Sequence, residues 1–346
     1  MDVRLSEEQR ALRDAAAQVV DRLGPKAVAQ IGEPERGARL HAAVTGSGWR
    51  ELRVGADGGG PLASGVEAAI VAEELGRGAA DVSFLGPTLA AELRRLAGAP
   101  PSSSVETVAL DTRLSSLVGG VGGDWPAAVA IDTQGSALAL VLTPVGEGSR
   151  LAGVALRAAP SGLDLTRPSE VLDPCPPATM VEGADRALTG DDLTRWTALG
   201  LSLSCADLVG TMRGAVELAC AYAAQRRQYG AAIGSFQAVQ HMLADAFVAT
   251  EGSRSVTLHA AWAVDALPAG EALAAAAVAK AYCGRAARTV CETGIQVHGG
   301  IGNTWECLAH VYLRRALLSA DLLGDALASL AHVLAHRGIG GTDGLR

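Results

Sequence analysis

Aromatic side chains are scarce in this sequence: Phe, Trp and Tyr make up only 3% of its 346 residues. Hydrophobic residues nevertheless reach 49%, which excludes an intrinsically disordered chain. Since so few of them are aromatic, the core must consist mainly of Ala, Leu and Val. Small side chains at helix contacts let the helix axes approach one another closely.

Positive charge is also in short supply, with 29 Lys and Arg residues against 37 Asp and Glu and a net charge of −8. The sequence contains no long run of Lys or Arg. Binding to the phosphate backbone of nucleic acid depends on clustered positive charge. The composition therefore excludes nucleic acid as a partner.

The six cysteines show neither a CxxC pair nor the spacing of metal ligands. We interpret them as free thiols of a protein in a reducing compartment, and we expect no metal site. The N-terminal residues lack the apolar stretch of a signal peptide. The apolar stretch 269–281 is interrupted by Glu271 and Lys280 and is too short to cross a bilayer. These features predict a cytoplasmic protein without a membrane span.

Proline is almost absent from the second half of the chain: 13 of the 14 prolines lie at or before Pro177, and only Pro268 follows. Because a proline inside a helix costs about 3 kcal/mol, this Ala- and Leu-rich region is expected to be mostly helical. Ser235 is the expected cap of one of its helices. Glycine-rich breaks and Pro268 divide it into four expected helices: 190–226, 236–266, 270–297 and 305–336. Four long helices predict a bundle.

The N-terminal region also has helical patterns, in shorter pieces. Ser6 and Gln9 have the spacing of a capping box, and Gly24 followed by Pro25 is expected to end the first helix. Further helices are expected over 38–47, 64–77 and 87–97.

The middle of the chain is different, because short apolar runs alternate there with Gly, Pro, Asp and Ser. Four strands of a small β domain are expected: 105–110, 127–131, 137–142 and 154–158. Helices, then strands, then helices is not the strand–helix alternation of a Rossmann fold. We therefore predict a mainly α protein with three domains: an N-terminal helical domain (1–102), a small β domain (103–187) and a C-terminal four-helix bundle (188–346).

Two segments carry candidate binding residues. In the first, Arg226 offers a fork for phosphate, Tyr229 a stacking face and Gln237 an amide in the first turn of a helix. The alternative is that the arginines only complement the negative end of the preceding helix. In the second, Gly299 and Gly300 either join two helices or let the backbone approach a ligand closely.

Together these segments resemble the acyl-CoA dehydrogenase family. The motif around Arg226 is similar to the family's R-x-x-F-G…Q, and the motif from 296 to 302 is similar to its Q-x-x-G-G-x-G. In the N-terminal half, 48–54, Gly58-Gly59 and 71–77 follow the family's pattern. The resemblance covers nearly the whole chain and implies the same three-domain architecture.

The resemblance also implies roles for particular residues. In the family the two segments hold the adenosine diphosphate part of the FAD that belongs to a neighbouring subunit. The positions that match are Arg226, Gln228, Tyr229, Gln237, Gln296, Gly299 and Gly300. Glu306, expected to start the last helix, coincides with one family position for the catalytic base. A second position falls near Gly200, where there is no carboxylate.

One family feature is missing. Members that bind their own FAD carry a segment like T-E-P-x-A-G-S-D at the start of the β domain, followed by a Trp-containing strand. The stretch 105–117 has no such motif, and Trp125 is either a substitute for the missing aromatic residue or a core residue.

This departure makes the chain similar to the shorter subunits of actinobacterial heterotetrameric (α2β2) dehydrogenases, which act on steroid side-chain CoA thioesters. The implied partners are an acyl-CoA substrate, a full-length homologous subunit that shares FAD at the interface, and an electron-transfer flavoprotein. Two alternatives remain open: a self-sufficient acyl-CoA dehydrogenase that uses Glu306, and a non-catalytic relative that binds CoA or protein.

Overall fold

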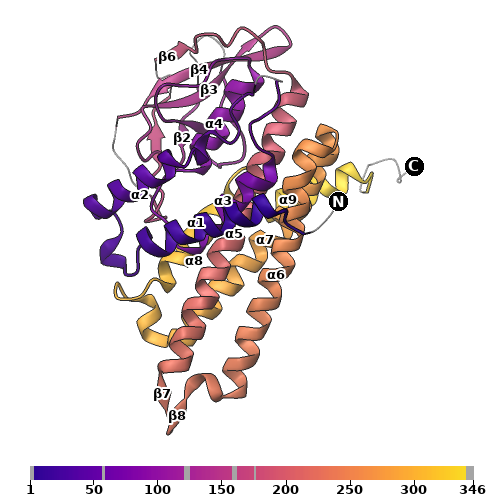
Figure 1. Cartoon of the computed structure of the whole chain (residues 1–346). Coiled ribbons are helices and arrows are strands. Elements are labelled where there is room, and N and C mark those ends of the chain that lie inside the picture. The colour runs from indigo at the N-terminus through magenta and orange to yellow at the C-terminus, as the bar shows by residue number, and fades with distance from the viewer. Residues whose placement is uncertain (1–3, 57–58, 121–124, 158–161, 175–176, 340–346) are drawn as a thin grey trace.

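The computed structural model describes residues 4–56, 59–120, 125–157, 162–174 and 177–339. Gly58 and Cys175, which the sequence patterns include, lie outside these residues. Helices come first, a β-sheet follows, and long helices form the rest (Figure 1). This order confirms the predicted mainly α fold, with an N-terminal helical part, a small sheet and a C-terminal helical region.

The N-terminal part consists of four α-helices: α1 (Glu7–Leu23), α2 (Pro34–Gly46), α3 (Gly65–Arg77) and α4 (Leu85–Leu96). The predicted capping box is present, since the Ser6 side chain accepts a hydrogen bond from the Gln9 backbone and the Gln9 side chain accepts one from the Ser6 backbone. Gly24 ends α1 as expected.

Among the described residues, the sheet has six strands in the order β5-β2-β1-β3-β4-β6, and of its paired strands only β1 and β3 are parallel. Its strands are β1 (Glu106–Asp111), β2 (Ala128–Ala130), β3 (Leu138–Val145), β4 (Gly148–Ala155), β5 (Glu170–Leu172) and β6 (Ala178–Met180). The predicted strand 154–158 was wrong, because β4 begins earlier, in a hairpin with β3. β5 and β6, each of three residues, were not predicted from the sequence.

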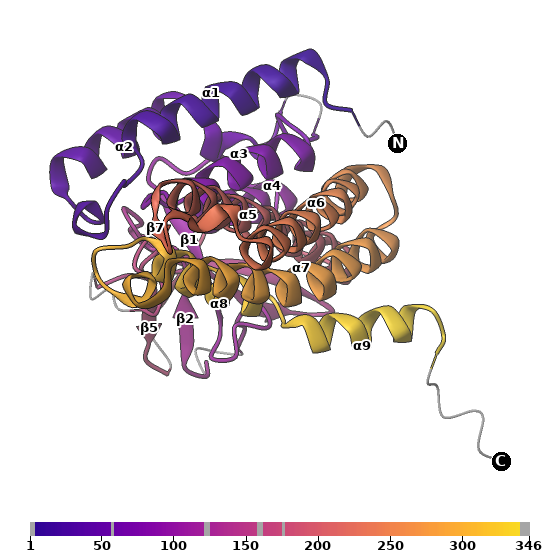
Figure 2. The ribbon, with the colours of Figure 1, turned by 90° about the horizontal axis from the view of Figure 1, so that it is seen from below.

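The C-terminal region contains α5 (Gly190–Gln225), α6 (Gln237–Ala266), α7 (Ala269–His298), α8 (Ala309–Asp321) and α9 (Ala326–His336). The first three match the predicted helices closely, but the single helix predicted over 305–336 was wrong. Figure 2 shows α9 extending from the end of α8 beside the bundle. The predicted domain limits stay predictions; they fall between α4 and β1 and between β6 and α5.

The corner between α8 and α9 has a backbone that a continuous helix cannot adopt. Leu323 and Gly324 have φ values of 61° and 105°, in the left-handed region that ends helices. From inside the core, the Lys280 ammonium donates hydrogen bonds to the carbonyls of Ser319 (2.6 Å) and Leu322 (2.8 Å). Burial lowers the pKa of Lys280 to about 8. This corner was not visible in the hydrophobic pattern of the sequence.

Small residues allow α3 and α5 to touch through their backbones. A Cβ atom at Gly210 would lie 1.8 Å from the Glu73 carbonyl oxygen, and one at Gly76 would lie 2.5 Å from the Asp207 carbonyl oxygen. The N-terminal helices and the bundle therefore share one continuous core. The low aromatic content is consistent with this close packing.

A fully buried ion cluster joins this core to the segment that precedes β5. Oδ1 of Asp207 on α5 accepts hydrogen bonds from Arg315 Nε (3.0 Å) and Nη2 (2.6 Å), and Oδ2 accepts one from Ser319 (2.6 Å). Arg167 Nη1 lies 3.1 Å from Asp207 Oδ2 and also pairs with Asp164. Burial alone raises the pKa of Asp164, but the Arg167 guanidinium holds it below its usual range. The cluster fixes α5, α8 and the sheet domain relative to one another.

Candidate functional site

The first candidate segment forms a two-stranded hairpin at the end of α5. Its strands are β7 (Arg227–Gln228) and β8 (Ala231–Ala232), and at its tip Tyr229 and Gly230 both have positive φ, 52° and 79°. Two consecutive positive φ values are typical of a type I′ turn. The hairpin protrudes at the lower end of the bundle in Figure 1, and Tyr229 is 95% exposed.

The hairpin returns directly to the first turn of α6. The carbonyl of Arg226 accepts a hydrogen bond from the Ile233 N–H (2.8 Å), and the Tyr229 and Phe236 rings meet edge to face at 6.4 Å. Phe236 occupies the N-cap of α6, so no side chain caps this 30-residue helix. Ser235, predicted as the cap, instead donates its hydroxyl to the Ala232 carbonyl. The uncapped helix start favours an anion near Gln237, the first residue of α6.

The second candidate segment lies at the same end of the bundle. Gln296 is exposed on the last turn of α7, and Gly299 caps that helix with φ 65° and ψ −144°, a conformation suited to glycine. Gly300 belongs to a short 3-10 helix, η4 (Gly299–Asn303), and a Cβ at either glycine would meet nothing within 4 Å. The backbone is therefore open to close approach.

Packing between α5 and α7 brings the two segments together. The ring of Tyr222 on α5 stacks on that of His298 on α7, with centroids 4.5 Å apart. Ala219, Ala223 and Val297 form a small apolar cluster beside them. The seven predicted cofactor-binding residues thus all lie at one end of the bundle.

These residues are available to a ligand or a neighbouring molecule. Arg226, Gln228 and Tyr229 are all exposed. Within the described part of the chain, the Arg226 guanidinium has neither an ion pair nor a hydrogen bond. A free guanidinium, an uncapped helix start and two open glycines match the needs of a diphosphate. The residues present therefore fit the phosphate part of FAD.

Glu306 lies in a turn rather than at the start of a helix, because α8 begins three residues later, at Ala309. The prediction that Glu306 starts the helix was wrong. Its side chain is exposed, and its backbone N–H donates to Thr304 Oγ1 (3.4 Å). Among the described residues, its carboxylate has no hydrogen-bond or ion-pair partner.

The second family position for a base, near Gly200, is closed by apolar side chains. A Cβ at Gly200 would lie 2.1 Å from Leu323 Cδ1 and 3.4 Å from Leu89 Cδ2. The corner between α8 and α9 therefore places Leu323 against the N-terminal third of α5. Trp125 is 3% exposed and packs in the sheet core with Ala109 and Val141, which favours the core interpretation of this residue.

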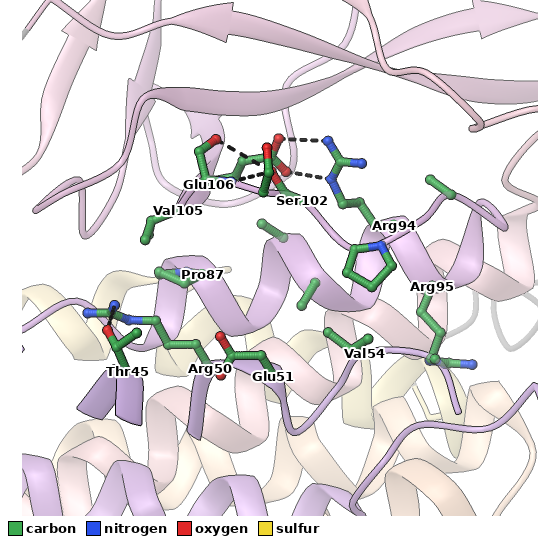
Figure 3. Close-up of a pocket in the computed structure, with 17 residues that line it drawn as sticks. Thr45, Arg50, Glu51, Val54, Pro87, Arg94, Arg95, Ser102, Val105 and Glu106 are labelled. Carbon is green, nitrogen blue, oxygen red and sulfur yellow. Dashed lines mark hydrogen bonds and ion pairs between the residues drawn. The ribbon is translucent and has the colours of Figure 1, made fainter. Parts of the chain in front are cut away.

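A cavity of about 210 Å³ lies between α4, the start of β1 and the short 3-10 helix η2 (Trp49–Glu51) (Figure 3). Most of its charged groups are already partnered: Arg94 binds Glu106 through two hydrogen bonds of 2.6 and 2.7 Å, and Arg50 donates to the Ser83 carbonyl (2.8 Å). None of the predicted site residues lines it. We assign this cavity no ligand.

One stretch of the described residues, Ala309–His336, is long and apolar enough to cross a membrane by length and composition. It consists of two helices, α8 and α9, separated by the corner at Leu323. Arg315 on α8 takes part in the buried ion cluster. These features make α8 a core helix of the bundle.

The sequence analysis missed one feature of this end of the molecule. Trp305 is 64% exposed, with the His310 ring edge-on at 5.2 Å and the Arg314 guanidinium 5.8 Å from its ring centroid. The tryptophan was visible in the motif, but its partners are brought to it by the turn before α8.

The buried ion cluster around Asp207 could not be predicted from the sequence either, since its members are distant in sequence.

A helical N-terminal part, a small sheet and a helical C-terminal region form the architecture of acyl-CoA dehydrogenases. Residues 6–95 match the family model for the acyl-CoA dehydrogenase N-terminal domain, and residues 201–325 match that for the acyl-CoA dehydrogenase C-terminal domain. The chain belongs to the acyl-CoA dehydrogenase family.

Three relatives are similar to this chain, one in sequence and two in fold. The chain is 34% identical to the acyl-CoA dehydrogenase IpdE2 of Mycobacterium tuberculosis over 341 residues, 92% of this chain and 93% of the relative. In fold it is similar to the ChsE4-ChsE5 complex of Mycobacterium tuberculosis (TM-score 0.78, 23% identity, 98% of this chain and 99% of the other). It is also similar to a variant of the Tcur3481-Tcur3483 steroid acyl-CoA dehydrogenase (TM-score 0.78, 23% identity, 96% and 98%).

Proposed function

We propose that this chain is a subunit of an FAD-dependent acyl-CoA dehydrogenase and completes the FAD site of a homologous partner subunit at their interface. The observation that carries the proposal is the exposed Arg226, which has no partner among the described residues, beside the uncapped start of α6. A cation on a protruding hairpin is well placed to reach a diphosphate held by another subunit.

Two observations on the described residues support a chain that has no second, independent site of its own. The family motif for the flavin ring is missing from 105–117, and Leu323 fills the space beside Gly200. Two similar structures are described as a two-component complex and as a two-component steroid acyl-CoA dehydrogenase. By analogy we propose an α2β2 assembly in the cytoplasm that acts on an acyl-CoA, with a steroid side-chain CoA as the candidate substrate.

These features assign different roles to this chain and to its partner subunit. Bound FAD supplies the hydride acceptor for the α,β-dehydrogenation of the acyl-CoA, and an electron-transfer flavoprotein is the proposed acceptor of its electrons. This chain binds and orients the cofactor's phosphates and adenosine. The residues that do so are Arg226, Tyr229 and Gln237, together with the open backbone at Gly299 and Gly300. The carboxylate that takes the α-proton is provided by the partner, because the Glu306 carboxylate is exposed and has no hydrogen-bond or ion-pair partner among the described residues.

Glu306→Gln tests where the base lies. Gln keeps the side-chain volume and removes the charge, and removal of a working general base costs about 10²–10⁴ in rate. In the co-purified complex we expect turnover to fall less than about tenfold. The measurement is acyl-CoA-dependent reduction of an artificial electron acceptor at saturating substrate.

Glu217→Gln, a change at an exposed carboxylate of α5, serves as the control and should leave turnover unchanged. A loss of about a thousandfold in Glu306→Gln, with flavin still bound, would assign proton abstraction to this chain and favour the self-sufficient enzyme. Absence of any dehydrogenation by the wild-type complex, with acyl-CoA bound, would favour the non-catalytic relative.

A further inference from the structure

An exposed apolar patch lies beside the proposed cofactor-binding end of the bundle. It consists of two apolar residues, Leu163 and Trp305, and of Arg314, which contacts both. These three residues are here called the Trp305 patch. Trp305 is 64% exposed and Leu163 51% exposed. Arg314 links them, since its guanidinium lies 5.8 Å from the Trp305 ring centroid and donates to the Leu163 carbonyl at 3.5 Å.

The tryptophan is held in place although it faces solvent. The His310 ring supports it edge-on at 5.2 Å, with an interplanar angle of 80°, and the Arg314 cation lies near its ring. A side chain that is already ordered loses little rotamer entropy when it is buried by a partner. Trp and Arg are also the residues most enriched among those that dominate the binding energy of protein interfaces.

The patch is continuous with the proposed interface. Trp305 follows the turn that carries Gly299 and Gly300, and Ile301 of that turn is itself 38% exposed. Thr304 connects Trp305 to this turn, because its N–H and its hydroxyl both donate to the Ile301 carbonyl, at 3.0 and 2.9 Å. A partner that brings its FAD to this turn therefore comes within reach of Trp305.

The charges at this end complement an acidic surface. Arg226, Arg227 and Arg314 are without carboxylate partners among the described residues, although the chain carries a net charge of −8. The exposed carboxylate of Glu306, next to Trp305, is also without a partner there, so it offsets only part of this positive charge. Cations left unpaired on an acidic protein favour a partner that offers carboxylates around the contact.

We propose that the Trp305 patch is the anchor by which this chain docks on its acyl-CoA dehydrogenase partner subunit. The Trp305 indole enters an apolar pocket of the partner, and Arg314 meets a carboxylate at the rim of that pocket. This inference rests on the proposed function for the identity of the partner, but it concerns protein–protein affinity rather than cofactor binding.

The test is the dissociation of the co-purified complex on dilution, followed by mass photometry. Trp305→Ala should raise the dissociation constant at least about tenfold, as expected for a central interface aromatic. Trp305→Phe should recover most of the affinity because it keeps an aromatic face. Leu62→Ala, a change at an exposed apolar residue (60%) of the N-terminal part, is the matched control and should change nothing.

The outcomes separate this inference from the proposed function. An unchanged dissociation constant in Trp305→Ala overturns the anchor, even if Arg226 proves essential for flavin binding. Loss of flavin without loss of assembly also overturns it, since the indole would then contact the cofactor. A change only in the self-association of this chain would show that a second copy covers the patch, which likewise contradicts the proposal. Weakened assembly supports it whether or not the isolated chain binds FAD.

Discussion

Arg226→Ala is expected to lower the flavin content of the co-purified complex sharply. The guanidinium is exposed and unpaired among the described residues, so its loss removes a contact to the cofactor without disturbing the fold. A charge-assisted, bidentate contact to phosphate contributes about 1.5–3 kcal/mol, which corresponds to roughly a tenfold to hundredfold loss of FAD affinity. The measurement is a titration of the apo complex with FAD, monitored by flavin fluorescence.

Two variants sharpen this test. Arg226→Lys should recover the affinity only in part, because an ammonium cannot present the planar fork of a guanidinium. Arg227→Ala is the matched control. Arg226 is the C-cap of α5 with an extended backbone (φ −69°, ψ 125°), and successive side chains of extended chain point to opposite sides. Arg227 Nη2 is also held by the Gly230 carbonyl at 3.2 Å. Equal FAD affinities in Arg226→Ala and the wild type would leave Arg226 as a cation that only complements the end of α5.

The second large effect is expected at Asp207. Asp207→Asn keeps the side-chain volume but removes the carboxylate that pairs directly with both buried guanidiniums, Arg315 and Arg167. Asp164 still pairs with Arg167, and the buried Asp132 carboxylate interacts electrostatically with both arginines. Breaking a buried ion pair by removing one partner costs about 3–5 kcal/mol. The variant should unfold at a markedly lower urea concentration than the wild type, as measured by circular dichroism.

The control is Asp191→Asn in the first turn of the same helix, where the carboxylate is exposed. Its loss removes only a favourable interaction with the helix dipole, about 0.3–1 kcal/mol. If Asp207→Asn unfolded at the same urea concentration as Asp191→Asn, the buried cluster would not hold the domains together as described.

The sequence predicted the features that depend on neighbouring residues. The capping box of Ser6 and Gln9, the end of α1 at Gly24 and the three long helices α5, α6 and α7 are all local patterns of caps, glycines and missing prolines. The motifs around Arg226 and Gly299 were likewise visible as spacings. Their residues lie at one end of the bundle because α5 and α7 end side by side.

The sequence did not predict what tertiary contacts decide. Ser235 is a good cap by residue type, but the hairpin return places Phe236 at the N-cap of α6. The corner at Leu323 interrupts an apolar pattern that otherwise continues as a helix, because buried Lys280 binds the carbonyls there. The environment of Glu306 also depends on the turn before α8, which shifts the start of that helix to Ala309.

The most direct measurement of the central claim is the flavin content of this chain purified alone and co-purified with a homologous full-length partner subunit. We expect little or no flavin absorbance in the isolated chain, because residues 105–117 lack the motif that holds the flavin ring. The complex should contain one FAD for each pair of unlike subunits. A stoichiometric amount of FAD in the isolated, folded chain would contradict the account and identify a self-sufficient dehydrogenase.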